Sequence, residues 1–212
     1  MIAWSAHSVL LHATLVTAQL FAMSAVVAVI LALVFGLALN STRAPIRVGA
    51  RIWCELFQGV SLTVQLFWFF FVLPLFGVTL PAVGAAVVAL GICFGAYGAD
   101  TVRSALQAVP RGQWEGAAAL GLRPVTTFTS VILPQAFRIM LPGLGNLALL
   151  ILKSTSVTAL ITIPELSFQA AAITNNFGAS ISVFAYVIFA YYAMAKIVIA
   201  MTRQIERLFA IP

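Results

Sequence analysis

Five apolar stretches, each longer than 20 residues and nearly free of charge, limit what this chain can fold into more than any other feature of its sequence. They run from about 13 to 39, 52 to 76, 81 to 106, 136 to 163 and 179 to 201. The hydrocarbon core of a bilayer is about 30 Å thick, and a helix needs about 20 apolar residues to cross it. We therefore predict an all-α, polytopic membrane protein with five transmembrane helices in a single domain over residues 1–212.

The composition excludes several other classes of protein. Apolar residues make up 63% and charged residues 8% of the sequence, whereas soluble domains carry about 25% charged residues. So few charges cannot form the water-facing surface of a soluble enzyme. The net charge of +6 does not indicate a nucleic-acid partner, because the basic residues are too few and too scattered to follow phosphates. We therefore expect the chain to be surrounded by membrane lipid.

The basic residues predict the orientation, since cytoplasmic loops carry an excess of Lys and Arg. Nine of the 11 basic residues lie between spans one and two, between spans three and four or within a few residues of that segment, or after span five: Arg43, Arg47, Arg51, Arg103, Arg111, Arg123, Arg138, Arg203 and Arg207. With five spans, these segments share one side only if the N-terminus is outside and the C-terminus is cytoplasmic. Residues 107–134 then form a long cytoplasmic loop.

The sequence argues against an enzyme. A membrane-buried serine near Gly59 would need a histidine base, but the histidines, His7 and His12, precede the first span. The chain has a single aspartate, Asp100, and no glycine precedes Lys153 or Lys196 as an ATP-binding loop requires. Both cysteines lie inside apolar runs, so no metal site is expected. We predict no cofactor in this chain.

The cytoplasmic loop carries the most specific pattern. Glu115-Gly116-Ala117 is followed after three residues by Gly121 and after nine more by Val131-Ile132-Leu133-Pro134. This spacing resembles the EAA loop of ABC importer permeases, E-A-A, three residues, G, nine residues, I-x-L-P. The surrounding segments, 96–103, 109–115 and 152–156, are similar to permeases of polar amino-acid importers, the histidine/glutamine/arginine class with the type I fold.

The chain departs from that class at three places. Gln58-Gly59-Val60-Ser61 stands where the class usually has Arg-Gly-Thr-Pro, Asp100 stands where it usually has Glu, and Ser104 stands where it usually has Gly. The stretches 64–68 and 95–98 resemble ectoine-type members of the same class. These departures bear on the solute rather than on the family.

The resemblance implies a permease subunit of an ATP-driven importer in the bacterial inner membrane. Its partners would be a second permease, identical or related, two cytoplasmic ATPase subunits that bind ATP and Mg, and an external solute-binding protein. The ATPase-coupling residues would be Arg111, Gly112, Gln113, Trp114, Glu115, Gly116, Ala117, Ala118 and Gly121. The local sequence also favours a short coupling helix here, because residues 113–120 are good helix formers and Gly121 is placed to end the helix.

Polar residues inside the spans are the remaining candidates. Asp100 and Arg103 are three residues apart on one expected helix, which predicts a structural ion pair. Lys153 lies about 17 residues into span four and is followed by Ser154, Thr155 and Ser156. This segment and Gln65 would either line a translocation path or bond neighbouring helices. Residues 165–177 are expected to form an external surface helix that contacts a solute receptor.

Two other functions fit a polytopic membrane protein. An ion-gradient-driven secondary transporter is commonly built from internal repeats, and no repeat is visible here. A non-transporting scaffold would need neither a buried lysine nor a polar path.

Overall fold

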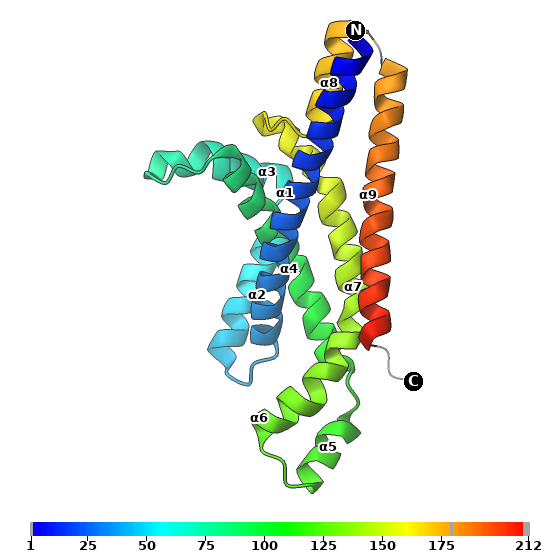
Figure 1. Ribbon diagram of the computed structural model, residues 1–212. Coiled ribbons are helices and arrows are strands. Elements are labelled where there is room, and N and C mark those ends of the chain that lie inside the picture. The colour runs from blue at the N-terminus through cyan, green and yellow to red at the C-terminus, as the bar shows by residue number, and fades with distance from the viewer. Residues whose placement is uncertain (1, 179, 210–212) are drawn as a thin grey trace.

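The computed structural model describes residues 2–178 and 180–209, and within these ranges the chain is helical without any strand (Figure 1). The helices are α1 (Ile2–Leu39), α2 (Ala44–Gly59), α3 (Leu62–Phe67), α4 (Ala82–Ala108), α5 (Arg111–Ala119), α6 (Pro124–Thr126), α7 (Leu133–Ser154), α8 (Leu166–Phe177) and α9 (Ser180–Phe209). Shorter π or 3-10 segments continue three of them: η1 (Trp68–Val72), η2 (Leu73–Phe76), η3 (Thr127–Ile132) and η4 (Thr155–Ile161). The all-α prediction is confirmed.

Four helices of the described residues are long and apolar enough to cross a membrane, and a bent pair makes up to a fifth span. They are α1, α4, α9 and the continuous run from Pro124 to Ile161. The predicted first span falls inside α1, and the predicted third and fourth spans overlap α4 and this run to within two residues at one end. The fifth was predicted to begin at residue 179, which lies outside the described residues, and α9 covers the rest of it.

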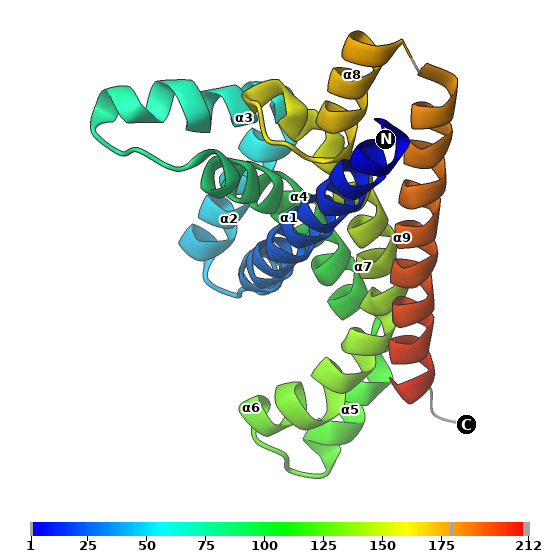
Figure 2. The same cartoon turned by 45° about the horizontal axis from the view of Figure 1, so that its top comes forward.

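The second predicted span, over residues 52–76, is bent rather than a single straight helix. Residues 44–59 and 62–76 form two helices that meet at 99°. Val60 and Ser61 are extended between them, and Gly59, a poor helix former, ends the first one. Figure 2 shows the second half leaving the bundle as an arm that starts at α3. A uniformly apolar stretch is compatible with either shape.

Glycines let α4 lie directly against α1. A Cβ atom added to Gly91 would lie 2.5 Å from Val27 Cγ1, and one added to Gly95 would lie 2.7 Å from Leu31 Cβ. Small residues at such positions are the usual way to pack helices closely in membranes. Because α2, α3 and α7 also contact α4, α4 is the central helix of the fold.

The segments assigned to the cytoplasm gather at one end of the bundle. Residues 40–43, the α5–α6 region and the last turn of α9 all lie at the end opposite to the start of α1 (Figure 1). This arrangement is compatible with the predicted topology. The side of the membrane on which each end lies remains a prediction.

Helix α8 is packed between α1 and α9 rather than lying on the surface as expected (Figures 1 and 2). Glu165 is fully buried and caps α8, because its Oε1 accepts a hydrogen bond from Phe168 N at 2.8 Å and its Oε2 accepts one from Tyr191 OH at 3.2 Å. Leu166 N donates to Thr17 Oγ1 at 3.1 Å. Burial raises the pKa of the Glu165 carboxyl. These bonds join three helices at one end of the bundle.

Candidate translocation groove and coupling helix

One face of α4 remains uncovered although most of the helix is buried. Tyr97, Asp100, Thr101, Ser104 and Ala108 recur at helical spacing and therefore share this face. The side chains of Tyr97, Asp100 and Ser104 are exposed. Polar groups at membrane depth normally face water or protein rather than lipid. This face is therefore a candidate for a solute path.

Two cavities follow this face, and we call them together the α4 groove. The first, of about 440 Å³, lies at the α2–α3 break and is lined chiefly by Gln58, Ser61, Cys93, Tyr97, Leu150 and Ser154. The second, of about 490 Å³, lies toward the C-terminal end of α4 and is lined by Asp100, Thr101, Ser104, Ala105, Ala108 and Ile139. Helix α4 forms the floor of the groove, with α2 at one side of the first cavity and α7 at the side of both.

Gln65 holds the α2–α3 break together. Its Nε2 donates to the backbone oxygens of Phe57 at 2.8 Å and Val60 at 2.9 Å. The last carbonyls of a helix have no partner within it, so this buried amide satisfies groups that the break exposes. Gln65 lines a separate, mostly apolar cavity of about 450 Å³ and is absent from the lining of the α4 groove. Its role as a path residue stays a prediction, and its visible role is to stabilise the bend.

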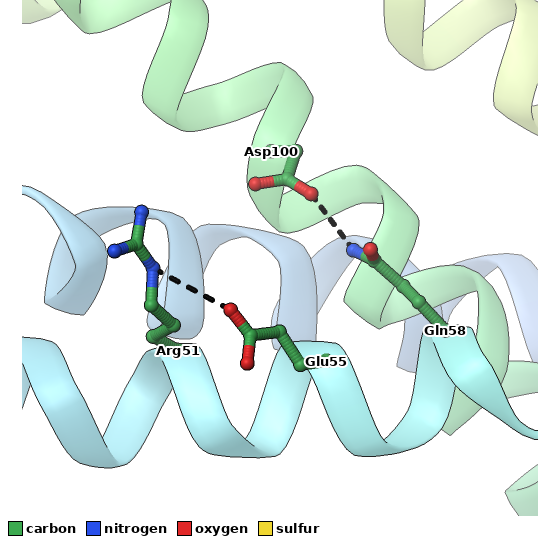
Figure 3. A network of polar contacts seen from close by, with 4 residues as sticks. All are labelled: Arg51, Glu55, Gln58 and Asp100. Atoms are coloured by element: carbon green, nitrogen blue, oxygen red, sulfur yellow. Dashed lines mark hydrogen bonds and ion pairs between the residues drawn. The ribbon is translucent and has the colours of Figure 1, made fainter.

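Gln58 connects α2 to the floor of the groove (Figure 3). Its Nε2 donates to Ala96 O at 2.9 Å and to Asp100 Oδ2 at 2.8 Å. Tyr97 OH in turn donates to the backbone oxygen of Gln58 at 3.2 Å. Our sequence reasoning missed Gln58 as a site residue. The signal was available, because Gln58 and Asp100 both stand at places where the chain departs from the class pattern, and these two residues meet.

The ion pair predicted between Asp100 and Arg103 does not form. In the described part of the chain, the side-chain ion pair within 4.0 Å is Arg51–Glu55 at 3.7 Å, on α2 (Figure 3). Asp100 is directed toward α2 instead, and the buried Nε of Arg103 has no hydrogen-bond partner. A separation of three residues permits pairing on a helix, but a neighbouring helix supplied Asp100 with a different partner.

The segment from Lys153 to Ser156 divides into two kinds of residue. Ser154 lines the first cavity of the groove, and the neighbouring Lys153 side chain is exposed. Thr155 Oγ1 donates to Leu152 O at 2.7 Å, and Ser156 Oγ donates to Lys153 O at 2.9 Å. These two hydroxyls satisfy backbone carbonyls where α7 tightens into η4. The geometry therefore brings Ser154 into the groove and gives Thr155 and Ser156 a local structural role.

Helix α5 projects beyond the bundle (Figure 1), and nearly all of the predicted coupling residues are exposed. Arg111 through Gly116 and Ala118 are exposed, and Ala117 alone is buried among the helical ones. The predicted end at Gly121 is found, with φ +70° at this glycine. Gly121 N donates to Ala118 O at 2.9 Å and Leu122 N donates to Ala117 O at 3.1 Å. These two bonds form a Schellman cap.

An apolar surface continues from α5, which the sequence reasoning did not single out. Leu120 is 80% exposed and Val125 is 74% exposed, beside the half-exposed Trp114. These residues lie outside the five spans predicted from the sequence, and large apolar residues exposed there indicate a protein contact. The same region is tied to the bundle, because Gln135 Nε2 of α7 donates to Gln113 Oε1 of α5 at 3.2 Å.

The structure offers no obvious metal centre in residues 2–178 and 180–209, where no three His, Cys, Asp or Glu side chains gather.

Comparison with known proteins settles the family. Residues 25–210 match the family described as "Binding-protein-dependent transport system inner membrane component". The chain belongs to this family. The permease is 39% identical over 178 residues to the probable amino-acid ABC transporter permease protein y4tF of Sinorhizobium fredii, covering 81% of this chain and 75% of that protein. It is 33% identical over 192 residues to the L-cystine transport system permease protein TcyB of Bacillus subtilis, covering 90% and 82%.

A solved structure has the same fold as this chain. The permease superimposes on a chain of an amino acid ABC transporter crystallised with histidines, with a TM-score of 0.87, 29% identity, and coverage of 98% of this chain and 96% of that one. The resemblance predicted from the loop spacing is therefore confirmed. The protein is a multi-pass inner-membrane permease component of an amino-acid ABC importer. Permeases of this family work with ATPase and binding-protein partners, so the secondary transporter and the scaffold are no longer candidates.

Proposed function

We propose that this permease forms one half of a translocation path for polar amino acids or related zwitterionic solutes, such as ectoine. The observation that carries the proposal is the α4 groove, in which polar side chains stand exposed on a membrane-spanning helix. The groove is open along its length, so a second permease subunit, identical or related, has to cover it. An external solute-binding protein would deliver the solute.

The first cavity suits a small polar solute. Ser61, Tyr97 and Ser154 place hydroxyl groups around it, and Gln58 adds an amide. Transporters often place binding sites at broken helices, because the break frees backbone groups at membrane depth. At the α2–α3 break, Gln65 already bonds the carbonyls of Phe57 and Val60, so the break contributes mainly the side chains that line the cavity. Lys153, exposed beside Ser154, would supply a positive charge for a solute carboxylate.

Helix α5 is proposed to couple the groove to two cytoplasmic ATPase subunits, which bind ATP and Mg. This chain itself would bind neither and break no bond. Helix α5 follows α4 in the chain and contacts η3, which leads into α7. Because α4 and α7 are the floor and a wall of the groove, a push on α5 would change the shape of both. The Gln113–Gln135 bond gives a second connection to α7.

The test is uptake into proteoliposomes by this permease, purified together with its own ATPase and binding protein. We expect uptake of labelled arginine, glutamine or ectoine that requires ATP and the binding protein. An ATPase whose nucleotide-binding lysine is replaced serves as the matched control and should abolish uptake. Uptake that persists without the ATPase, or that a protonophore abolishes while ATP remains, would contradict the proposal.

A further inference from the structure

A pocket of about 290 Å³ lies between α7 and the last three turns of α9, apart from the α4 groove. The two open on different sides of α7, because Leu149 lines the pocket whereas the next residue, Leu150, lines the groove. Adjacent residues of a helix point about 100° apart. A second permease that covers the α4 groove can therefore leave this pocket open.

The lining of the pocket changes from apolar to charged toward the end of α9. Leu149 of α7 and Ile199 of α9 form the apolar part, and Arg203 and Glu206 form the charged part. The last apolar stretch of the sequence ends near residue 201. The two charges therefore stand at the depth of the lipid headgroups, and the apolar part stands within the hydrocarbon core. A membrane lipid has its polar and apolar parts in this same order.

Neither charge in the pocket is balanced by the protein. In residues 2–178 and 180–209, no Asp or Glu carboxylate lies within 4.0 Å of the Arg203 guanidinium, and no Lys or Arg nitrogen lies within 4.0 Å of the Glu206 carboxylate. The two residues are three apart on one helix, a spacing at which they could have paired. Unpaired charges of opposite sign in one pocket suit a ligand that carries both signs.

The surroundings of α9 supply such a ligand. Ile197, Met201 and Leu208 are exposed on this helix, and in a multi-pass membrane protein such apolar side chains face lipid. Basic pockets between transmembrane helices are known to hold lipid headgroups. Small-molecule pockets usually measure about 300–1,000 Å³, so this one has room for a headgroup and its glycerol but not for a whole lipid.

We propose that the pocket between α7 and α9 binds the headgroup of phosphatidylethanolamine, with the phosphate on Arg203 and the primary ammonium on Glu206. The anionic headgroup of phosphatidylglycerol would satisfy Arg203 but would bring no cation to Glu206. The trimethylammonium group of phosphatidylcholine carries a positive charge but has no N–H to donate to the carboxylate. This site is independent of the solute that the permease transports.

Lipid binding to the purified, delipidated permease–ATPase complex tests the site. The probes are dioctanoyl phosphatidylethanolamine, phosphatidylglycerol and phosphatidylcholine, and free phosphoethanolamine as the headgroup alone. Dissociation constants are measured by native mass spectrometry for the wild type, Arg203→Gln and Glu206→Gln. The matched controls are Arg123→Gln and Glu55→Gln, which make the same charge changes outside the pocket.

We expect the wild type to bind phosphatidylethanolamine about tenfold more tightly than the other two lipids, the effect of one charged hydrogen bond, and free phosphoethanolamine more weakly still. Arg203→Gln should weaken phosphatidylethanolamine binding about tenfold. Glu206→Gln should strengthen phosphatidylglycerol binding until the preference is lost, and the controls should keep the preference.

Three results would overturn the proposal. The first is a wild type that prefers phosphatidylglycerol or phosphatidylcholine, and this order can be measured even if a variant is poorly recovered. The second is binding of phosphatidylethanolamine that neither Arg203→Gln nor Glu206→Gln changes, as expected if another protein chain covers the pocket. The third is binding of free phosphoethanolamine as tight as that of the lipid, because the ligand would then be a soluble metabolite.

Discussion

The amide of Gln135 donates a hydrogen bond to the amide oxygen of Gln113 over 3.2 Å, and so ties the first turn of α7 to the coupling helix α5. The contact joins the element proposed to meet the ATPase with a wall of the groove. It lies at the surface, where one such bond contributes about 1 kcal/mol. It should therefore affect the transmission of movement more than folding.

Replacing Gln135 by Ala should uncouple the transporter in part. We expect the number of ATP molecules hydrolysed per solute transported to rise about two- to fivefold, consistent with the loss of about 1 kcal/mol. The control is Gln107→Ala, because Gln107 donates a bond of the same kind and length to Asn40, away from α5. The measurement is parallel ATPase and uptake rates in proteoliposomes. An equal change in both variants would remove the Gln113–Gln135 contact from the coupling route.

A large side chain should have different effects at the two neighbouring alanines of α5, on ATPase binding at one and on folding at the other. Ala118 is exposed and Ala117 is 4% exposed. Ala118→Trp should leave the amount of folded permease unchanged and reduce the co-purified ATPase severalfold, as should Glu115→Lys. Ala117→Trp should lower the amount of folded permease, because overpacking costs about 1–3 kcal/mol. Normal ATPase recovery with both Ala118→Trp and Glu115→Lys would show that α5 docks by another surface.

Lys153 should be dispensable for assembly. Its side chain is exposed, and in the described part of the chain no carboxylate oxygen lies within 4.0 Å of its ammonium. Lys153→Met keeps the length of the side chain and removes the charge. We expect normal recovery of the complex and about tenfold slower uptake of amino acids if the lysine binds a solute carboxylate. Lys153→Arg, which keeps the charge, should restore most of the rate. Loss of assembly would make the residue structural.

Glu165 should make the stability of the permease depend on pH. Burial raises its pKa in the folded state above the ordinary value of 4.5. The folded protein then binds more protons than the unfolded one, so this group's contribution is fully present below pH 4.5 and is lost as the pH rises through the raised pKa. Glu165→Gln should remove this part of the dependence and narrow the difference in melting temperature between pH 5 and pH 8 by about 2–4 °C. An unchanged difference in detergent-purified protein would contradict the assignment.

The topology predicted from the arginines can be tested with two reporter insertions. A reporter near Arg123, between α5 and α7, should be cytoplasmic, and one near Asn175, at the end of α8, should be external. The two sites lie toward opposite ends of the bundle (Figure 1), so one cannot change side without the other. An external signal near Arg123 would reverse the orientation and remove the docking role of α5.

The features that the sequence predicted well are local in the chain. The apolar stretches are long enough for spans whatever their neighbours do, which makes an all-α membrane fold the expected result. The end of α5 at Gly121 depends on one residue that adopts a positive φ at little cost. The loop spacing around Glu115 is equally local, and it led to the family without any knowledge of the packing.

Only the tertiary structure determined which polar side chains on different helices bond to one another. Asp100 was assigned to Arg103, three residues away, yet it bonds with Gln58, which is 42 residues earlier. Gln65 was left open between lining a path and bonding a neighbouring helix, and the fold shows its amide bonding the end of α2 across the bend. Hydropathy and helical spacing define which face a residue occupies on its own helix. They do not define which helix lies opposite, because that depends on how glycines such as Gly91 let the helices approach one another.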